Sequence, residues 1–184
     1  MGASNPDIRN EVDDSRGVLK KLQLLIPGFR GYRQMEDLRV ADALLRKQVS
    51  AYLETSLSKL QDFRSSLVSS GNYQYLVQLS SDLSRLQQFQ GELLHSERGY
   101  SGISPAIRID MQKLNSLYEY DYTFMQGASD MVKLSDMSSV DLSSQADLTK
   151  RLSDLEAAIM MMKNGWEQRL LKVEDIKLNP GGSS

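Results

Sequence analysis

The stretch LTKRLSDLEAAIMMMKNGWEQRLLKV, residues 148–173, decides the fold of this chain of 184 residues. Its apolar residues follow a spacing of four, three, four, three and four residues, which places them on one side of an α-helix. They are Leu148, Leu152, Leu155, Ile159, Met162, Trp166 and Val173. A single apolar stripe with this repeat predicts a long helix in a helical bundle or along a coiled-coil seam.

The remainder of the chain is also suited to long helices. It contains four prolines, which are Pro6, Pro27, Pro105 and Pro180. Proline breaks the interior of a helix but is accepted in the first turn, so the proline-free stretches 28–104 and 106–179 are free to be helical. No sustained alternation of apolar and polar residues predicts a strand.

Cap and turn signals divide the chain into five predicted helices. Asn5 and Ser104 are N-cap residues, each followed by a proline in the first turn. Ser144 with Asp147 resembles a capping box, although Asp141 could start that helix earlier. The Gly71-Asn72 pair predicts a tight turn between two helices. The predicted helices are a short one ending near Ile26 and four long ones over residues 33–69, 73–98, 104–134 and 145–178.

Helices that are joined by short turns must reverse direction from one to the next. We therefore predict an all-α fold, an elongated antiparallel bundle of four long helices preceded by a shorter N-terminal helix. Residues 1–178 would form a single helical-bundle domain, and residues 179–184 would be a disordered tail.

Composition excludes several kinds of chemistry. The chain has 22 Lys and Arg, 24 Asp and Glu, one His and no Cys. Without cysteine there is no disulfide, thiolate zinc site or thiol nucleophile, and one histidine cannot supply a three-histidine metal site. No apolar run approaches the roughly 18 residues of a membrane span. Residues 1–6 do not open a signal peptide, so we expect a cytoplasmic protein.

The pair Glu92 and His95 is the one pattern that could belong to a di-iron helical bundle. Such a site needs a second Glu-x-x-His pair, and the chain has no other histidine. By helical angle, both residues point away from the apolar stripe of their helix. The sequence therefore predicts a surface histidine near a helix C-terminus and no metal site.

Asp121 lies in the middle of the apolar face of the helix predicted over residues 104–134. A buried carboxylate must be paired, protonated or reached by water. Its candidate partners are an Arg or a Tyr hydroxyl from a facing helix, and Gln90, a polar residue on the stripe of helix 73–98. Our interpretation is that Asp121 and Gln90 fix the register of the helices. The alternatives are a ligand or proton site inside the bundle, or a kinked helix that exposes Asp121.

Tyr118, Tyr120 and Tyr122 lie close together on the same helix. By angle, Tyr120 and Tyr122 flank the core face on either side. Packing at the boundary of the core explains them, and an aromatic contact patch for a partner helix is the alternative.

The segment IPGFRGYR, residues 26–33, predicts a sharp corner. Pro27 and Gly28 suit the centre of a type II turn, after which Phe29 would anchor the corner in the core. Arg30 and Arg33 would then project and are candidates for contact with an anion or a partner. The segment lacks the glycine spacing of a nucleotide-binding loop, so we favour a structural corner.

This segment continues as MEDLRVADALLRK, and together they resemble the opening of an uncharacterised prokaryotic α-helical family. In that family a PG-aromatic-x-GY turn precedes an acidic, Arg-rich helix. The resemblance covers residues 25–47 and implies no activity and no catalytic residue.

The predicted function is that of a non-enzymatic interaction protein, an adaptor, scaffold or complex subunit with a protein partner and no cofactor. No nucleophile with its base, metal cluster or phosphate loop can be assembled. One alternative is a carboxylate site inside the bundle, around Asp121 and Gln90, that binds a metal or a small molecule. Another is peripheral binding to an anionic surface through residues 16–47, whose eight basic and three acidic side chains give a net charge of +5.

Nucleic acid is not an expected partner. The sequence leaves open whether the protein forms a homo-oligomer, because Leu57 and Leu171 lie off the main stripes of their helices and could seed a dimer contact or simply widen a core face.

Overall fold

The computed structural model describes residues 8–31, 35–95, 109–179 and 181, and in these residues every regular element is a helix. This confirms the predicted all-α class. A single 3₁₀ turn, η1, precedes the third helix. The elements are α1 (Ile8–Leu25), α2 (Met35–Ser69), η1 (Tyr73–Tyr75), α3 (Leu76–His95), α4 (Met111–Leu134) and α5 (Gln145–Leu178).

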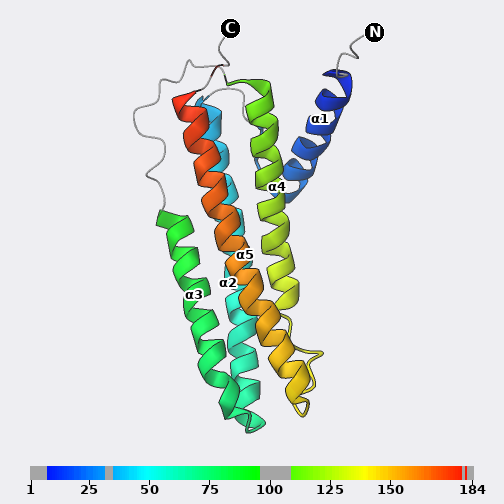
Figure 1. Cartoon of the computed structure of the whole chain (residues 1–184), viewed down its shortest axis with the longest axis vertical. Coiled ribbons are helices and arrows are strands. Elements are labelled where there is room, and N and C mark those ends of the chain that lie inside the picture. Colours follow the sequence, from blue (N-terminus) through cyan, green and yellow to red (C-terminus); the bar gives the residue numbers. More distant parts are fainter. Residues whose placement is uncertain (1–7, 32–34, 96–108, 180, 182–184) are drawn as a thin grey trace, which may run out of the picture.

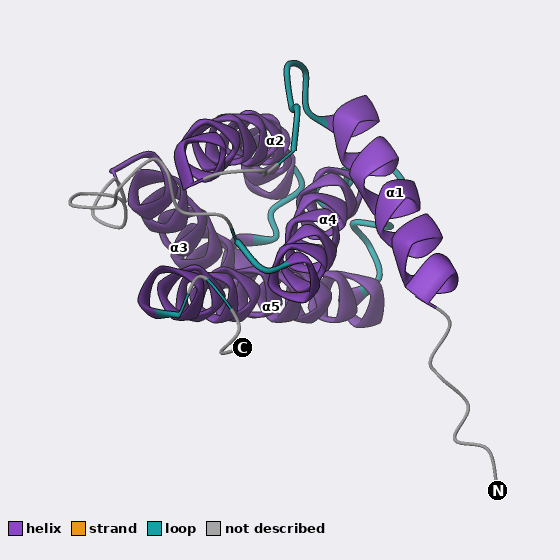
Figure 2. Ribbon diagram, turned by 90° about the horizontal axis from the view of Figure 1, so that it is seen from above, coloured by secondary structure: helices purple, strands orange, loops and turns teal. Residues whose placement is uncertain are grey.

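The four long helices form a bundle of two hairpins, α2 with α3 and α4 with α5 (Figure 1). Within each hairpin the helices are antiparallel. Seen down the bundle, they surround a common core in the order α2, α3, α5, α4, so that α2 also packs on α4 and α3 on α5 (Figure 2). Helix α1 packs mainly against α4, and its N-terminal end stands away from the bundle (Figure 1).

The stripe that decided the fold is the core face of α5. All seven of its apolar residues are buried, each with at most 5% of its surface exposed. The face of α2 is buried in the same way from Leu38 to Leu67, and this includes Leu57. Of the two interpretations of Leu57, a dimer contact or a wider core face, its burial supports the wider core face, whereas Leu171 is 58% exposed.

The turn between α2 and η1 is built as the sequence predicts. Gly71 has φ +78°, a left-handed conformation that glycine adopts without strain. Asn72 follows it, and its Nδ2 donates a hydrogen bond of 2.8 Å to the carbonyl oxygen of Leu142, in the segment that joins α4 to α5. The two hairpin turns are thus tied together at one end of the bundle.

One predicted helix start is confirmed and another is wrong. The Ser144 hydroxyl accepts a hydrogen bond of 3.2 Å from the N–H of Asp147 and caps α5. Helix α4 begins at Met111, and its N-cap is Asp110 instead of Ser104, because the Asp110 carboxylate accepts the N–H groups of the first turn. The predicted caps Asn5 and Ser104 themselves lie outside the described residues.

At the other end of the chain Asn179 is the C-cap of α5 and its N–H bonds the carbonyl oxygen of Asp175, so it belongs to the helix end. The rest of the predicted disordered tail, apart from Gly181, lies outside the described residues.

The corner between α1 and α2 is confirmed up to residue 31. The N–H of Phe29 donates to the carbonyl oxygen of Ile26 at 3.1 Å, and Gly28 has φ +83°, as the third residue of a type II turn requires. Phe29 is buried and its ring meets that of Tyr118 edge-on, with 6.5 Å between the ring centroids. Arg30 is exposed, as predicted, and Arg33 lies outside the described residues.

Candidate functional site

Asp121 is fully buried, as the helical wheel predicts, and its partner is Arg169 of α5. The Arg169 Nε donates a hydrogen bond of 2.6 Å to the Asp121 Oδ1. Arg169 is itself 0% exposed and its guanidinium lies 5.3 Å from the centroid of the Trp166 ring. The sequence left an Arg or a Tyr hydroxyl open as the partner of Asp121, and the structure shows an arginine from a facing helix.

Arg169 also joins Asp121 to α2. Its Nη1 donates to the Asp42 Oδ1 at 2.5 Å, and the Asp42 Oδ2 accepts from the Arg46 Nε at 2.8 Å. The Arg46 Nη1 continues to α3, where it donates to the carbonyl oxygen of Leu93 at 3.2 Å. We call Asp42, Arg46, Asp121 and Arg169 the ionic cluster, and it reaches all four helices of the bundle.

The ionic cluster contains two carboxylates and two guanidinium groups, so its formal charges cancel. Arginine stays protonated in proteins and its planar fork matches a carboxylate. Asp121 and Asp42 already bind these cations, so they are not placed to serve as an exchangeable acid, base or metal ligand. In the described part of the chain, no three His, Asp or Glu side chains gather as a metal site.

Gln90 does not meet Asp121, which corrects the sequence prediction. It is half-buried, and its Nε2 donates to the carbonyl oxygen of Ser50 at 3.1 Å. Its neighbour Phe89 takes the central place on α3 and packs edge-on against Phe124, with 6.3 Å between the ring centroids. The register of α3 is set by this aromatic contact and by the bond of Gln90 to α2.

The sequence analysis missed four buried charged residues, Asp42, Arg46, Asp82 and Arg169, and for the last two the apolar repeat carries a signal. Arg169 lies three residues after Trp166 and four before Val173, so it fills the one polar position on the stripe of α5. Asp82 likewise lies three residues after Leu79 and four before Leu86. A charged residue at an apolar position of the repeat marks a buried ion.

Asp82 is only 1% exposed, and neither of its carboxylate oxygens accepts a hydrogen bond from the described residues. Burial, with the nearby charge of Glu156, raises the pKa of Asp82 to about 6. The Arg85 guanidinium opposes this shift only weakly, since it lies 3.7 Å from the Asp82 Oδ1 and also pairs with Glu156. Asp82 is thus a buried carboxyl that titrates near neutral pH.

The three tyrosines of α4 serve different contacts. Tyr118 is buried against the corner at Phe29, and a Cβ at Gly31 would lie 2.9 Å from its hydroxyl oxygen. Tyr122 is half-buried beneath Lys21 of α1, whose Nζ lies 5.3 Å from the ring centroid. Tyr120, also half-buried, lines a groove on the opposite side of α4.

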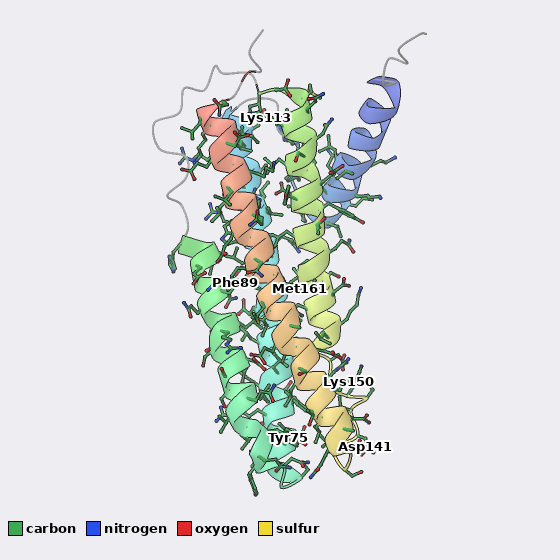
Figure 3. The ribbon with its side chains drawn as sticks, viewed as in Figure 1. Tyr75, Phe89, Lys113, Asp141, Lys150 and Met161 are labelled. Carbon is green, nitrogen blue, oxygen red and sulfur yellow. The ribbon has the colours of Figure 1, made fainter. Side chains whose placement is uncertain are left out.

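This groove lies between α4 and α5 and has a volume of about 790 Å³. Apolar side chains form most of its walls, and Figure 3 labels one of them, Met161, about halfway along α5. Three small residues leave the space open, which are Gly127, Ala158 and Gly165. A Cβ on Gly165 would meet no atom within 4 Å, and one on Gly127 would lie 3.6 Å from the Met162 Cγ. We call this depression the α4–α5 groove.

The two ends of the α4–α5 groove differ in charge. Tyr120 and Gln168, both uncharged, lie at one end. Lys133 and Arg151 lie at the other, with one acidic residue, Asp130. The lining spans fifteen residues of α4, from Tyr120 to Leu134, which is a length of about 20 Å at 1.5 Å per residue. The groove is therefore long, apolar and basic at one end.

The Glu92 and His95 pair lies at the surface. Glu92 accepts a hydrogen bond from Gln88, and its Oε1 lies 3.5 Å from the Nζ of Lys163 on α5. His95 is the last residue of α3 and is exposed, as the helical angle predicts.

The basic segment 16–47 divides between surface and core. Its exposed basic residues include Lys20, Lys21, Arg39 and Lys47, whereas Arg46 is buried in the ionic cluster. Binding of this segment to an anionic surface stays a prediction.

Comparison of the chain with protein-family models, curated protein sequences and solved structures found no match. The resemblance of residues 25–47 to a prokaryotic helical family stays an expectation. Among the described helices, none combines the length and the apolar composition needed to cross a membrane.

Proposed function

We propose that this protein is a non-enzymatic binding protein that holds a small molecule in the α4–α5 groove. The observation that carries the proposal is the groove itself. Its volume of about 790 Å³ falls within the range of roughly 300–1,000 Å³ of known small-molecule sites, and like them it has apolar walls with a few polar groups.

The ionic cluster supports a structural role and not a site of chemistry. Its carboxylates are bound by arginines in the middle of the bundle, where Asp121 and Arg169 have no exposed surface. A ligand site is therefore better supported in the α4–α5 groove, on the side of the bundle, than inside the bundle around Asp121 and Gln90.

Substitution of Gly165 tests the groove directly. A leucine side chain at this position has open space before it and would fill the groove, so Gly165→Leu should abolish binding of a hydrophobic probe such as 1-anilinonaphthalene-8-sulfonate. The bundle should stay folded, because leucine favours helix more than glycine does.

Gly91→Leu is the matched control. Gly91 is also a helical glycine with no atom within 4 Å of an added Cβ, but it does not line the groove. Probe fluorescence that is the same for Gly165→Leu, Gly91→Leu and the unchanged chain would contradict the proposal.

A protein partner is the second candidate function, and the outer side of α5 favours it. Met160, Leu171 and Leu178 are 56%, 58% and 74% exposed. They are eleven and seven residues apart, which puts them within about 20° of one another on the helix. This stripe suits the apolar face of a helix from a partner protein, so that the chain would act as an adaptor, scaffold or complex subunit.

The stripe is tested by Leu171→Lys in affinity capture from native cell extract. A partner that docks on the stripe should be lost with this variant, because the lysine charge would be buried in the contact. It should be kept with Leu24→Lys, which changes a leucine that is 81% exposed on α1. Equal capture by both variants would remove the stripe as the contact surface, and the mass of the purified chain in solution would show whether the partner is a second copy.

A further inference from the structure

We infer that the ligand of the α4–α5 groove is an amphipathic anion, a free molecule with an apolar chain along the groove and an acidic head at Arg151. The inference rests on the proposed function, because it names the chemistry of the molecule held in that groove.

The apolar chain of the ligand is inferred from the residues that line the α4–α5 groove. Phe124, Met131, Met161 and Met162 line the groove. Met161 is 73% exposed and supplies the most exposed surface of these four, whereas the other three are at most 5% exposed. Flexible methionine side chains adapt to apolar ligands of different shape. Covering this surface would remove it from water, which is the main source of affinity for an apolar chain.

The acidic head follows from Arg151. Its Nη2 donates to the backbone carbonyl oxygen of Asp136 at 3.0 Å, and its Nε is shielded from water yet has no acceptor. Among the described residues no carboxylate forms an ion pair with this guanidinium. An arginine that is half-buried, lines a groove and has no counter-ion favours a bound anion.

Two carboxylates near this end of the groove already pair with lysines. The Asp136 Oδ2 binds the Lys59 Nζ at 2.8 Å, and this contact lowers the pKa of Asp136, which stays ionised and held by lysine. Asp130 is paired with Lys133 at 2.7 Å. Arg151 is thus the cation of the groove that a ligand can neutralise.

The opposite end excludes the reverse orientation. Tyr120, Thr123 and Gln168 offer hydroxyl and amide groups there but no positive charge. An acidic head at that end would be partly removed from water without a counter-ion, which is unfavourable.

The test uses three probes that share one chain and differ in head group: dodecanoate, dodecan-1-ol and dodecyltrimethylammonium, each below its critical micelle concentration. Binding to the full chain is measured by isothermal titration calorimetry at pH 7.5. Dodecanoate should bind about tenfold more tightly than dodecan-1-ol, because of its charge-assisted bond to Arg151, and dodecyltrimethylammonium should bind most weakly.

Substitutions in the protein then distinguish the contribution of the probe's head group to binding from that of its apolar chain. Arg151→Gln should weaken dodecanoate about tenfold and leave dodecan-1-ol unchanged, and Arg151→Lys should keep most of the preference for the acid. Gly165→Leu should abolish binding of all three probes, and Gly91→Leu should change none of them. Circular dichroism of each variant checks that the helices are kept.

The outcomes distinguish a failure of the inference about the anionic head from a failure of the proposed function of the groove. If Arg151→Gln leaves the ratio between acid and alcohol unchanged, the anionic head is wrong although the groove still binds. If Gly165→Leu leaves dodecanoate bound, or if no probe binds the unchanged chain, the groove as a ligand site is wrong and the inference fails with it. Binding of anionic phospholipid vesicles in place of free dodecanoate would also overturn a free amphiphile as the ligand.

Discussion

Replacement of Arg169 by methionine is expected to lower the free energy of unfolding by about 3–5 kcal/mol. Methionine fills much of the volume of the arginine chain but removes the Arg169 cation from both Asp121 and Asp42. Since Asp121 is 0% exposed, water cannot replace the lost partner. Urea denaturation of the variant, followed by circular dichroism at pH 7.5, measures this loss.

Lys150→Met is the control for this prediction. Lys150 also pairs with a carboxylate, that of Asp154, but its side chain is 79% exposed and that of Asp154 is 45% exposed. Exposed ion pairs contribute about 0–1 kcal/mol, so this variant should lose little. If both variants lose the same stability, the ionic cluster does not anchor the bundle.

A second substitution measures how much of this loss of stability comes from the charge of Asp121 once Arg169 is removed. Adding Asp121→Leu to Arg169→Met removes the carboxylate that lost its cation, and the double variant should recover part of the stability. A double variant that is less stable than Arg169→Met alone would mean that the loss comes from packing around Trp166 and not from the buried charge.

Asp82→Asn is expected to stabilise the protein by about 2–3 kcal/mol at pH 8 and by almost nothing near pH 4. The pKa of this carboxyl rises from 3.8 in the unfolded chain to about 6 in the folded chain. Between these values the folded chain binds more protons than the unfolded chain, so the stability contributed by Asp82 falls as the pH rises. Asparagine resembles the protonated acid at every pH.

The measurement for Asp82 is the difference in unfolding free energy between variant and unchanged chain at several pH values. This difference should grow from about pH 4 to about pH 7 and then stay constant. Asp154→Asn on α5, whose side chain is 45% exposed, is the control and should give a small difference without this slope. A constant difference for Asp82→Asn would show that burial does not raise its pKa.

The apolar pattern predicted the helices because each stripe repeats over many turns and each turn adds to the same face. It placed Asp121 correctly for the same reason, since six neighbours in sequence define its side of the helix. It could not choose the partner of Asp121, which comes from a residue 48 positions along the chain and depends on how the hairpins dock.

Local signals were weaker. The sequence analysis took Ser104, which is followed by proline, as the cap of α4 and did not consider Asp110, whose carboxylate accepts the first-turn N–H groups. The α4–α5 groove was not predicted, because its space is left by side chains that are absent, at Gly127 and Gly165. A glycine in a helix gives no sign in sequence of what lies beside it.

The ionic cluster has a consequence for the order in which the bundle assembles. Asp42 and Arg46 both lie on α2, and Asp121 and Arg169 belong to the other hairpin, so each hairpin contains one carboxylate with its own guanidinium. Each hairpin can therefore neutralise its charges through contacts nearer in sequence before the two meet, and only the bond from Arg169 to Asp42 must wait for docking. We therefore expect folding to begin with local hairpin formation, and the later step to bring together two hairpins whose parts of the ionic cluster carry no net charge.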